Sequence, residues 1–176
     1  MSDKLTVLFS EEEIDKRIRE LGLQISSEYE GREITIICTL KGACFFACEL
    51  AKRITCPVKM EFMKCSSYGN GTESTGEVRI MLDVDSPLSK KDVLIVEDII
   101  DSGRTLAALK DSLKNRGANS VKVCSLLDKP SRRVVDVKAD YLGYSIPDKF
   151  VVGYGLDYAQ KYRNLPYIAE VELQEV

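Results

Sequence analysis

Apolar and polar positions along the chain form alternating blocks of strand and helix character. The strand-like blocks are short, rich in Val and Ile, and bounded by charged or turn-forming residues. They cover residues 34–40, 58–63, 78–84, 93–96, 121–127, 141–146, 151–154 and 168–171. Several of them are separated by longer blocks with the periodicity of an amphipathic helix. This alternation predicts an α/β fold with a central parallel sheet.

The first helical block has a defined start. Ser10 and Glu13 form the pattern of a capping box, in which each side chain satisfies the backbone N–H of the other residue. Apolar residues then recur every three or four positions over 14–25. Two further helices are predicted over 43–54 and 106–117. Parallel α/β sheets bind ligands at the carboxyl ends of their strands, so we expect the functional residues there.

The stretch VLIVEDIIDSGRTL, residues 93–106, carries the most specific chemistry. We expect its apolar strand to stop at residue 96, where a tight acidic loop starts with Glu97 and Asp98. Asp101 follows just before a helical pattern begins. A helix N-cap role for Asp101 would explain the turn. It would not explain the acidic pair beside it.

The same turn has the features of a phosphate site. A helix N-terminus offers unpaired backbone N–H groups and the positive end of the helix dipole. Gly103 would let the backbone curve closely around an anion. The hydroxyl groups of Ser102 and Thr105 can donate further hydrogen bonds.

The chain has six cysteines and no histidine. The cysteines form no C-x-x-C pair, which favours reduced and mostly buried thiols over disulfides or a zinc site. Without histidine, neither a histidine general base nor a Ser-His-Asp triad can occur. Acid–base chemistry must therefore depend on Asp, Glu, Lys, Tyr or Cys.

Charge and hydropathy narrow the choice of partners. The net charge is −3 and the pI is about 5.2, so no overall basic field would attract nucleic acid. No apolar segment approaches the roughly 18 residues needed to span a bilayer, and the first residues lack a signal-peptide pattern. We expect a cytoplasmic protein with no nucleic-acid or membrane partner. Anionic substrates would be held locally, by helix ends, a few Lys or Arg side chains and a metal ion.

The acidic pair followed by Asp-Ser-Gly-Arg-Thr resembles the signature of the phosphoribosyltransferases, which bind phosphoribosyl pyrophosphate (PRPP) with this loop. The resemblance extends over residues 34–163 and points to the hypoxanthine (6-oxopurine) branch. It implies one type I phosphoribosyltransferase domain over 1–176, with a central parallel sheet flanked by helices. It also implies a small purine-side hood, built from the N-terminal segment and about 141–176, and a flexible lid loop over about 65–77.

The resemblance assigns roles to individual residues. Asp101 would be the catalytic acid or base for the purine ring nitrogen. PRPP would be bound by Lys41, Gly42, Glu97, Asp98, Asp101, Ser102, Gly103, Arg104, Thr105 and Arg163. The purine would be bound by Lys129, Phe150, Val151 and Asp157, and the lid would begin with Ser67 and Tyr68. Lys41 would lie in an unusual backbone conformation, and Lys129 would donate to the purine 6-oxo group, which disfavours adenine.

The implied reaction transfers the 5-phosphoribosyl group from PRPP to hypoxanthine, and also to guanine, and releases pyrophosphate. Carboxylates beside a polyanion need a cation, which argues for Mg²⁺. The resemblance makes Asp157 its direct protein ligand and Glu97 and Asp98 direct or indirect ones. It also implies a homodimer or homotetramer. Hypoxanthine, guanine and xanthine all remain open as acceptors.

Plainer interpretations compete with these roles. Lys41, Lys129 and Arg163 could be surface cations, Phe150 a core residue, and Asp157 a turn aspartate. A regulatory protein of the same fold would bind PRPP as an effector and act on nucleic acid, but it should carry a basic face. A phosphoacceptor signalling domain would share the Lys129-Pro130 pair, but its acidic pair should lie on the first strand. A P-loop nucleotidase is excluded because no G-x-x-x-x-G-K-[ST] motif occurs.

Overall fold

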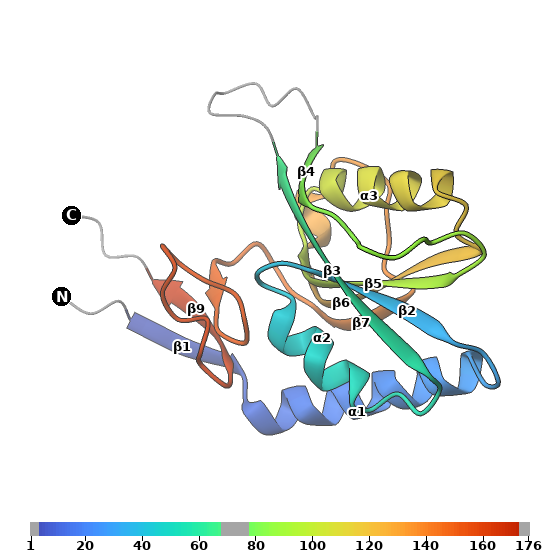
Figure 1. The fold of residues 1–176 in the computed structure, drawn as a ribbon. Coiled ribbons are helices and arrows are strands. Elements are labelled where there is room, and N and C mark those ends of the chain that lie inside the picture. The colour runs from blue at the N-terminus through green and yellow to red at the C-terminus, as the bar shows by residue number, and fades with distance from the viewer. Residues whose placement is uncertain (1–3, 68–77, 173–176) are drawn as a thin grey trace.

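A six-stranded, mostly parallel sheet forms the centre of the molecule (Figure 1). The computed structural model describes residues 4–67 and 78–172 of the chain. The sheet contains β2 (Ile34–Thr39), β3 (Val58–Ser67), β4 (Val78–Leu82), β5 (Asp92–Ile100), β6 (Ser120–Asp128) and β7 (Tyr141–Ser145). Their order is β4-β3-β2-β5-β6-β7, and all neighbours pair in parallel except β3 and β4. The predicted α/β class is confirmed.

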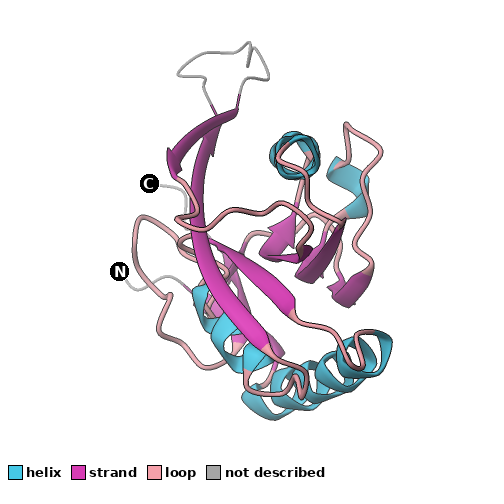
Figure 2. Ribbon diagram, turned by 45° about the vertical axis from the view of Figure 1, so that its right-hand side comes forward, coloured by secondary structure: helices cyan, strands magenta, loops and turns pink. Residues whose placement is uncertain are grey.

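Helices cover both faces of this sheet. α1 (Glu11–Glu28) and α2 (Cys44–Ala51) lie on one face, and α3 (Arg104–Asn115) lies on the other (Figures 1 and 2). Successive side chains of β5 point to opposite faces of the sheet, so the strand contributes to the hydrophobic core on both sides. Leu94 and Val96 pack with α1 and α2, whereas Val93 and Ile95 pack with α3. A strand buried on both faces explains the continuous apolar run in the sequence.

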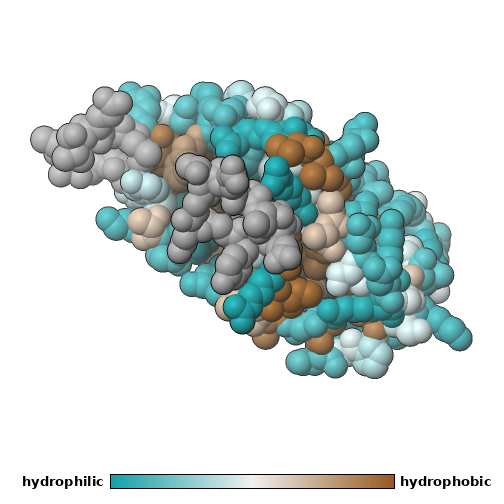
Figure 3. All heavy atoms as spheres, turned by 90° about the horizontal axis from the view of Figure 1, so that it is seen from above, coloured by the Kyte–Doolittle hydropathy of each residue, from teal (hydrophilic) through white to brown (hydrophobic). Residues whose placement is uncertain are grey.

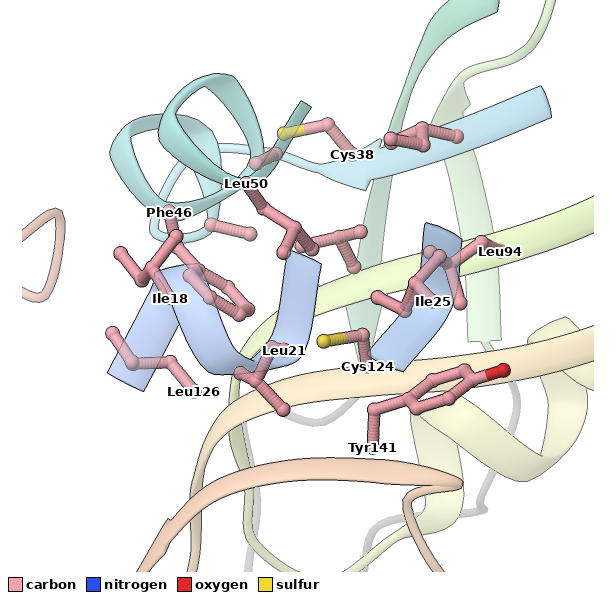
Figure 4. Packing of buried hydrophobic residues seen from close by; sticks show 14 of the residues in the cluster. Ile18, Leu21, Ile25, Cys38, Phe46, Leu50, Leu94, Cys124, Leu126 and Tyr141 are labelled. Carbon is pink, nitrogen blue, oxygen red and sulfur yellow. The ribbon is translucent and has the colours of Figure 1, made fainter. Parts of the chain in front are cut away.

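The capping box predicted at the start of α1 is present. The Glu13 N–H group donates to Ser10 Oγ at 3.2 Å, and the Ser10 N–H group donates to Glu13 Oε2 at 2.8 Å. The apolar face of α1 then packs against α2 and the strands (Figure 4). Its labelled members Ile18, Leu21 and Ile25 are fully buried. Large-to-small substitutions here would cost about 2–5 kcal/mol each.

A second, three-stranded antiparallel sheet joins the two ends of the chain. It has the order β1-β9-β8, with β1 (Lys4–Phe9), β9 (Ile168–Glu172) and β8 (Val151–Val152). The sequence interpretation predicted no strand over residues 4–9, because β1 forms by pairing with β9 from the other end of the chain. The predicted hood boundary at residue 141 is wrong, since β7 pairs with β6 in the main sheet.

Two predicted strand ends also differ from the structure. β5 continues through Glu97 and Asp98 to Ile100, because its backbone keeps pairing with β6 beyond the apolar run. β3 continues to Ser67 by pairing with β4, so the expected loop does not begin at residue 65. Tyr68 and the rest of the expected lid, up to residue 77, lie outside the described residues. Within the described ranges, no helix is long and apolar enough to cross a membrane.

Candidate active site

Polar side chains gather where β2, β5 and β6 end. One cavity of about 270 Å³ is lined by Thr39, Leu40, Lys41, Gly42, Cys65, Glu97, Asp98, Thr105, Asp157 and Arg163. A second cavity of about 190 Å³ is lined by Glu97, Ile99, Ile100, Asp101, Ser102, Gly103, Thr105 and Leu106. The two cavities share Glu97 and Thr105, so they adjoin one another. Figure 3 shows the molecule from above the view of Figure 1. Hydrophilic residues cover most of the described surface on this side, with smaller hydrophobic patches between them.

Both residues of the acidic pair line the larger cavity, Glu97 also lines the smaller one, and each makes a hydrogen bond to a nearby protein group. Thr39 Oγ1 donates to Glu97 Oε2 at 2.7 Å, because the parallel register brings the ends of β2 and β5 side by side. The Ile99 N–H group donates to Asp98 Oδ1 at 2.8 Å. Burial raises the pKa of Glu97, and the neighbouring Asp98 charge raises it further. Burial likewise raises the pKa of Asp98. Both carboxyl groups would therefore be stabilised by hydroxyl donors or a cation in the cavity.

The turn from Asp101 to Thr105 is held in place by contacts with the segment 134–137. Gly103 caps α3 with φ of +82°, and a Cβ atom there would lie 2.5 Å from Val137 Cγ1. The carbonyl oxygen of Ser102 accepts the N–H groups of Val134 at 2.9 Å and Val135 at 3.1 Å. The first turn of α3 thus opens toward the smaller cavity. The Arg104 N–H group donates to Ser102 Oγ at 3.4 Å, and the positive end of the helix dipole at this turn suits an anion.

The loop after β2 packs tightly against the acidic pair. The peptide bond between Leu40 and Lys41 is cis, as the resemblance suggested for this unusual backbone. A Cβ atom on Gly42 would come within 1.5 Å of Asp98 Oδ2, so any larger residue would displace the Asp98 carboxylate. Lys41 is exposed, and its Nζ donates to Gln160 Oε1 at 3.2 Å. The loop therefore presents backbone and one cation to the larger cavity.

Asp157 and Arg163 form another part of the wall of the larger cavity. The Nη2 atom of Arg163 lies 2.7 Å from Asp157 Oδ1, and Arg163 Nη1 donates to the Gly155 carbonyl at 2.7 Å. The Gln160 N–H group donates to Asp157 Oδ2 at 2.8 Å. Both oxygens of Asp157 thus have protein partners. Among the described residues, no three His, Cys, Asp or Glu side chains are placed to hold a metal ion by themselves.

A third group of residues lies beyond the end of β6. Lys129 is only 9% exposed, and its Nζ lies 3.7 Å from Asp148 Oδ1. Val151 is buried in β8. Phe150 is 45% exposed, and its ring meets that of Tyr158 edge-on at 5.6 Å. Lys129 is therefore no surface lysine and Phe150 is no core residue, so both plainer interpretations are wrong.

The sequence pattern of the phosphoribosyl transferase domain matches residues 7–159. The chain belongs to this phosphoribosyltransferase family. It is 54% identical over 162 residues to the hypoxanthine-guanine phosphoribosyltransferase of Bacillus subtilis (strain 168), covering 92% of this chain and 90% of that protein. It is also 54% identical over 167 residues to the bifunctional protein TilS/HprT of Listeria monocytogenes (strain F2365). That match covers 95% of this chain, but the chain spans only 26% of the bifunctional protein.

Solved structures agree with this family. A hypoxanthine phosphoribosyltransferase from Staphylococcus aureus superposes with a TM-score of 0.92 at 48% identity, covering 95% of this chain and 91% of that one. A hypoxanthine-guanine phosphoribosyltransferase from Bacillus anthracis, crystallised with HEPES in its active site, has a TM-score of 0.92 at 49% identity. The match covers 97% of this phosphoribosyltransferase and 100% of that chain.

The structure brings together most of the residues that the sequence singled out in this phosphoribosyltransferase. The acidic pair, the turn at Asp101 and the loop at Lys41 line adjoining cavities. Arg163 and Asp157 line the larger one, where they pair with each other. Neither is a free surface residue, since each is half-buried in this wall.

Sequence reasoning missed three polar residues at this site, Thr39, Arg132 and Arg133. Thr39 holds Glu97, as described above. Arg132 Nε donates to Asp101 Oδ1 at 2.7 Å, and Arg133 Nη1 donates to the Asp101 carbonyl oxygen at 2.8 Å. Asp148 lies against both Lys129 and Arg132. The Lys-Pro-Ser-Arg-Arg run after β6 was a usable signal, because cations that closely follow a strand end lie near the ligand edge of the sheet.

Proposed function

We propose that this chain transfers the 5-phosphoribosyl group from PRPP to a ring nitrogen of hypoxanthine or guanine and releases pyrophosphate. One observation carries the proposal most directly. The N-terminus of α3, opened by Gly103, adjoins the carboxyl groups of Glu97 and Asp98 in connected cavities. An anion site next to paired acceptors fits a phosphorylated sugar, since carboxylates accept hydrogen bonds from hydroxyl groups.

PRPP would extend across both cavities. Its 5-phosphate would bind the backbone N–H groups and hydroxyl groups of the turn formed by Asp101, Ser102, Gly103, Arg104 and Thr105. Its ribose hydroxyl groups would donate to Glu97 and Asp98. Its pyrophosphate would meet Lys41, the backbone at Gly42, and Arg163 in the larger cavity. Such an arrangement stabilises the negative charge that grows on pyrophosphate as the bond at C1 breaks.

The purine would lie between Asp101 and the group beyond β6. Lys129 would donate to the 6-oxo group, and the half-exposed ring of Phe150 would stack on the base. The backbone at Val151 would read the edge of the ring, and Asp157 would lie beside it. Asp101 would exchange a proton with the purine ring nitrogen. Holding donor and acceptor in line would contribute a large part of the rate.

The donor set is compatible with Mg²⁺. Every candidate ligand is a carboxylate oxygen, which is the type of donor this ion prefers. Because both oxygens of Asp157 already have protein partners, most of the ligands would be oxygens of the substrate and water, with Glu97 and Asp98 nearby. When bound, the ion would neutralise pyrophosphate charge. Crowded and buried carboxyl groups with raised pKa values are consistent with a site that receives a cation.

Three further expectations stay predictions. The chain would form one functional domain over 1–176, and it would assemble as a homodimer or homotetramer, which light scattering would test. The lid role of Ser67 and Tyr68 concerns the segment that begins where the described part of β3 ends. Shortening that segment should reduce turnover and leave the melting temperature nearly unchanged.

Initial rates with PRPP, Mg²⁺ and each of hypoxanthine, guanine and xanthine would test the function. We expect formation of the nucleoside monophosphate and pyrophosphate from hypoxanthine and guanine. Calorimetric binding of PRPP without any turnover would instead favour a regulatory protein of the same fold. Neither binding nor turnover would contradict the proposal altogether.

A further inference from the structure

A row of alternating charges connects Asp101 to Lys129. Arg132 Nε lies 2.7 Å from Asp101 Oδ1, and Arg132 Nη1 lies 3.3 Å from Asp148 Oδ2. The other oxygen of Asp148, Oδ1, lies 3.7 Å from Lys129 Nζ. One guanidinium group thus bridges two carboxylates, and the second carboxylate faces the buried lysine. The planar fork of arginine suits such a bridge, whereas a lysine ammonium is a single point charge.

The backbone brings Arg132 to this place. Residues Pro130–Arg132 form one turn of 3-10 helix directly after Lys129, and the Arg132 N–H group donates to the Lys129 carbonyl at 3.1 Å. The next residue, Arg133, donates to the main-chain carbonyl of Asp101 and pairs with Asp128 at the end of β6. Two consecutive arginines therefore hold Asp101, one by its side chain and one by its backbone.

We propose that Arg132 is a positioning residue for the phosphoribosyl transfer, an inference that rests on the function proposed above. Its guanidinium group occupies Oδ1 of Asp101 and leaves Oδ2 to exchange the proton with the purine ring nitrogen. Through Asp148, the same group fixes the distance between Asp101 and Lys129. The purine is thereby held at two atoms, its ring nitrogen and its 6-oxo group, by side chains with a fixed separation.

Stability alone gives a poor account of this bridge. The side chains of Arg132 and Asp101 are 51% and 47% exposed, and ion pairs in such positions contribute little to folding. The charge of Asp101 and the hydrogen bond to Asp148 raise the pKa of Arg132. The guanidinium group consequently stays protonated and acts only by charge and geometry. Losing it should thus affect catalysis far more than folding.

The test compares Arg132→Gln with Arg132→Lys and with a matched control, Arg116→Gln. Arg116 forms a partly exposed bidentate pair with Asp83, at 2.6 and 2.8 Å, away from the candidate site. We expect Arg132→Gln to lower kcat about tenfold to a hundredfold, as misplacement of a proton-transfer group does. The KM for hypoxanthine should rise, because Asp148 and Lys129 lose their anchor. The KM for PRPP and the melting temperature should stay near the wild-type values.

The remaining variants distinguish the effect of the position of the guanidinium group from the effect of its positive charge. Arg132→Lys should recover part of kcat, since an ammonium group can still reach one carboxylate, and Arg116→Gln should keep wild-type kinetics. Asp148→Asn should raise the KM for hypoxanthine, and it should add little to the kcat loss when combined with Arg132→Gln. Unchanged kcat in Arg132→Gln, or a loss of kcat/KM that comes only from a higher KM for PRPP, would overturn this inference but not the proposed function. A wild-type protein that forms no nucleotide would overturn the proposed function itself.

Discussion

Replacing Gly103 by alanine should destabilise the turn that forms the candidate phosphate site and weaken the binding of PRPP. The residue has φ of +82°, a region that costs an L-residue about 1–2 kcal/mol. A Cβ atom would also lie 2.5 Å from Val137 Cγ1 and 3.1 Å from the Val135 carbonyl oxygen. Such overpacking typically costs about 1–3 kcal/mol. The sum of about 2–5 kcal/mol corresponds to a fall in melting temperature of roughly 5–15 °C for a chain of this length.

Gly31→Ala is the matched control. Gly31 has φ of +73°, but a Cβ atom there would meet nothing within 4 Å, so only the backbone cost of about 1–2 kcal/mol remains. Calorimetric melting of both variants isolates the effect of the contact with Val137. Steady-state kinetics should then show a raised KM for PRPP in Gly103→Ala alone. Equal melting temperatures and equal kinetics in the two variants would refute the account of this turn.

Three further outcomes follow from the site. Asp101→Asn should keep its affinity for PRPP in calorimetry but lose about 10²–10⁴-fold in kcat, and unchanged kinetics would remove Asp101 from the mechanism. Glu97→Gln should raise the melting temperature at neutral pH by about 2–4 °C while lowering activity. Burial raises the pKa of Glu97 in the folded state above its unfolded value, so this carboxyl group lowers the stability of the fold as pH rises from the unfolded pKa toward the folded one. The gain in melting temperature from Glu97→Gln should therefore shrink as pH falls toward the ordinary carboxyl range. Mg²⁺ and PRPP together should raise the melting temperature by roughly 5–10 °C near 100-fold saturation, and Mg²⁺ alone should have little effect, because no described cluster binds it unaided.

Local patterns predicted the elements whose own residues determine them. The capping box of Ser10 and Glu13, the apolar face of α1 and the apolar core of β5 all follow from sequence spacing. The extension of β5 to Ile100 and of β3 to Ser67 depends on pairing with neighbouring strands, which a single sequence does not reveal. β1 forms for the same reason, because it pairs with β9 from the other end of the chain.

Some residues of the candidate site could likewise be predicted from local sequence, and others could not. The turn at Gly103 was predictable because one short motif carries the acidic pair, the glycine and the helix start. Thr39 reaches Glu97 only through the register of two strands. The bridge from Asp101 to Arg132 and Asp148 joins three separate segments, so the cations after β6 indicate a position near the site but not which carboxylates they pair with.

Binding of the sugar phosphate tests the central claim most directly. Isothermal titration should be carried out with ribose 5-phosphate, PRPP and unphosphorylated ribose, on the wild-type chain and on Gly103→Ala. We predict heat of binding for both phosphorylated ligands, none for ribose, and weaker binding of both ligands to the variant. Absence of heat with ribose 5-phosphate and PRPP, or equal affinity for ribose, would contradict the assignment of the turn at Asp101 as a phosphate site.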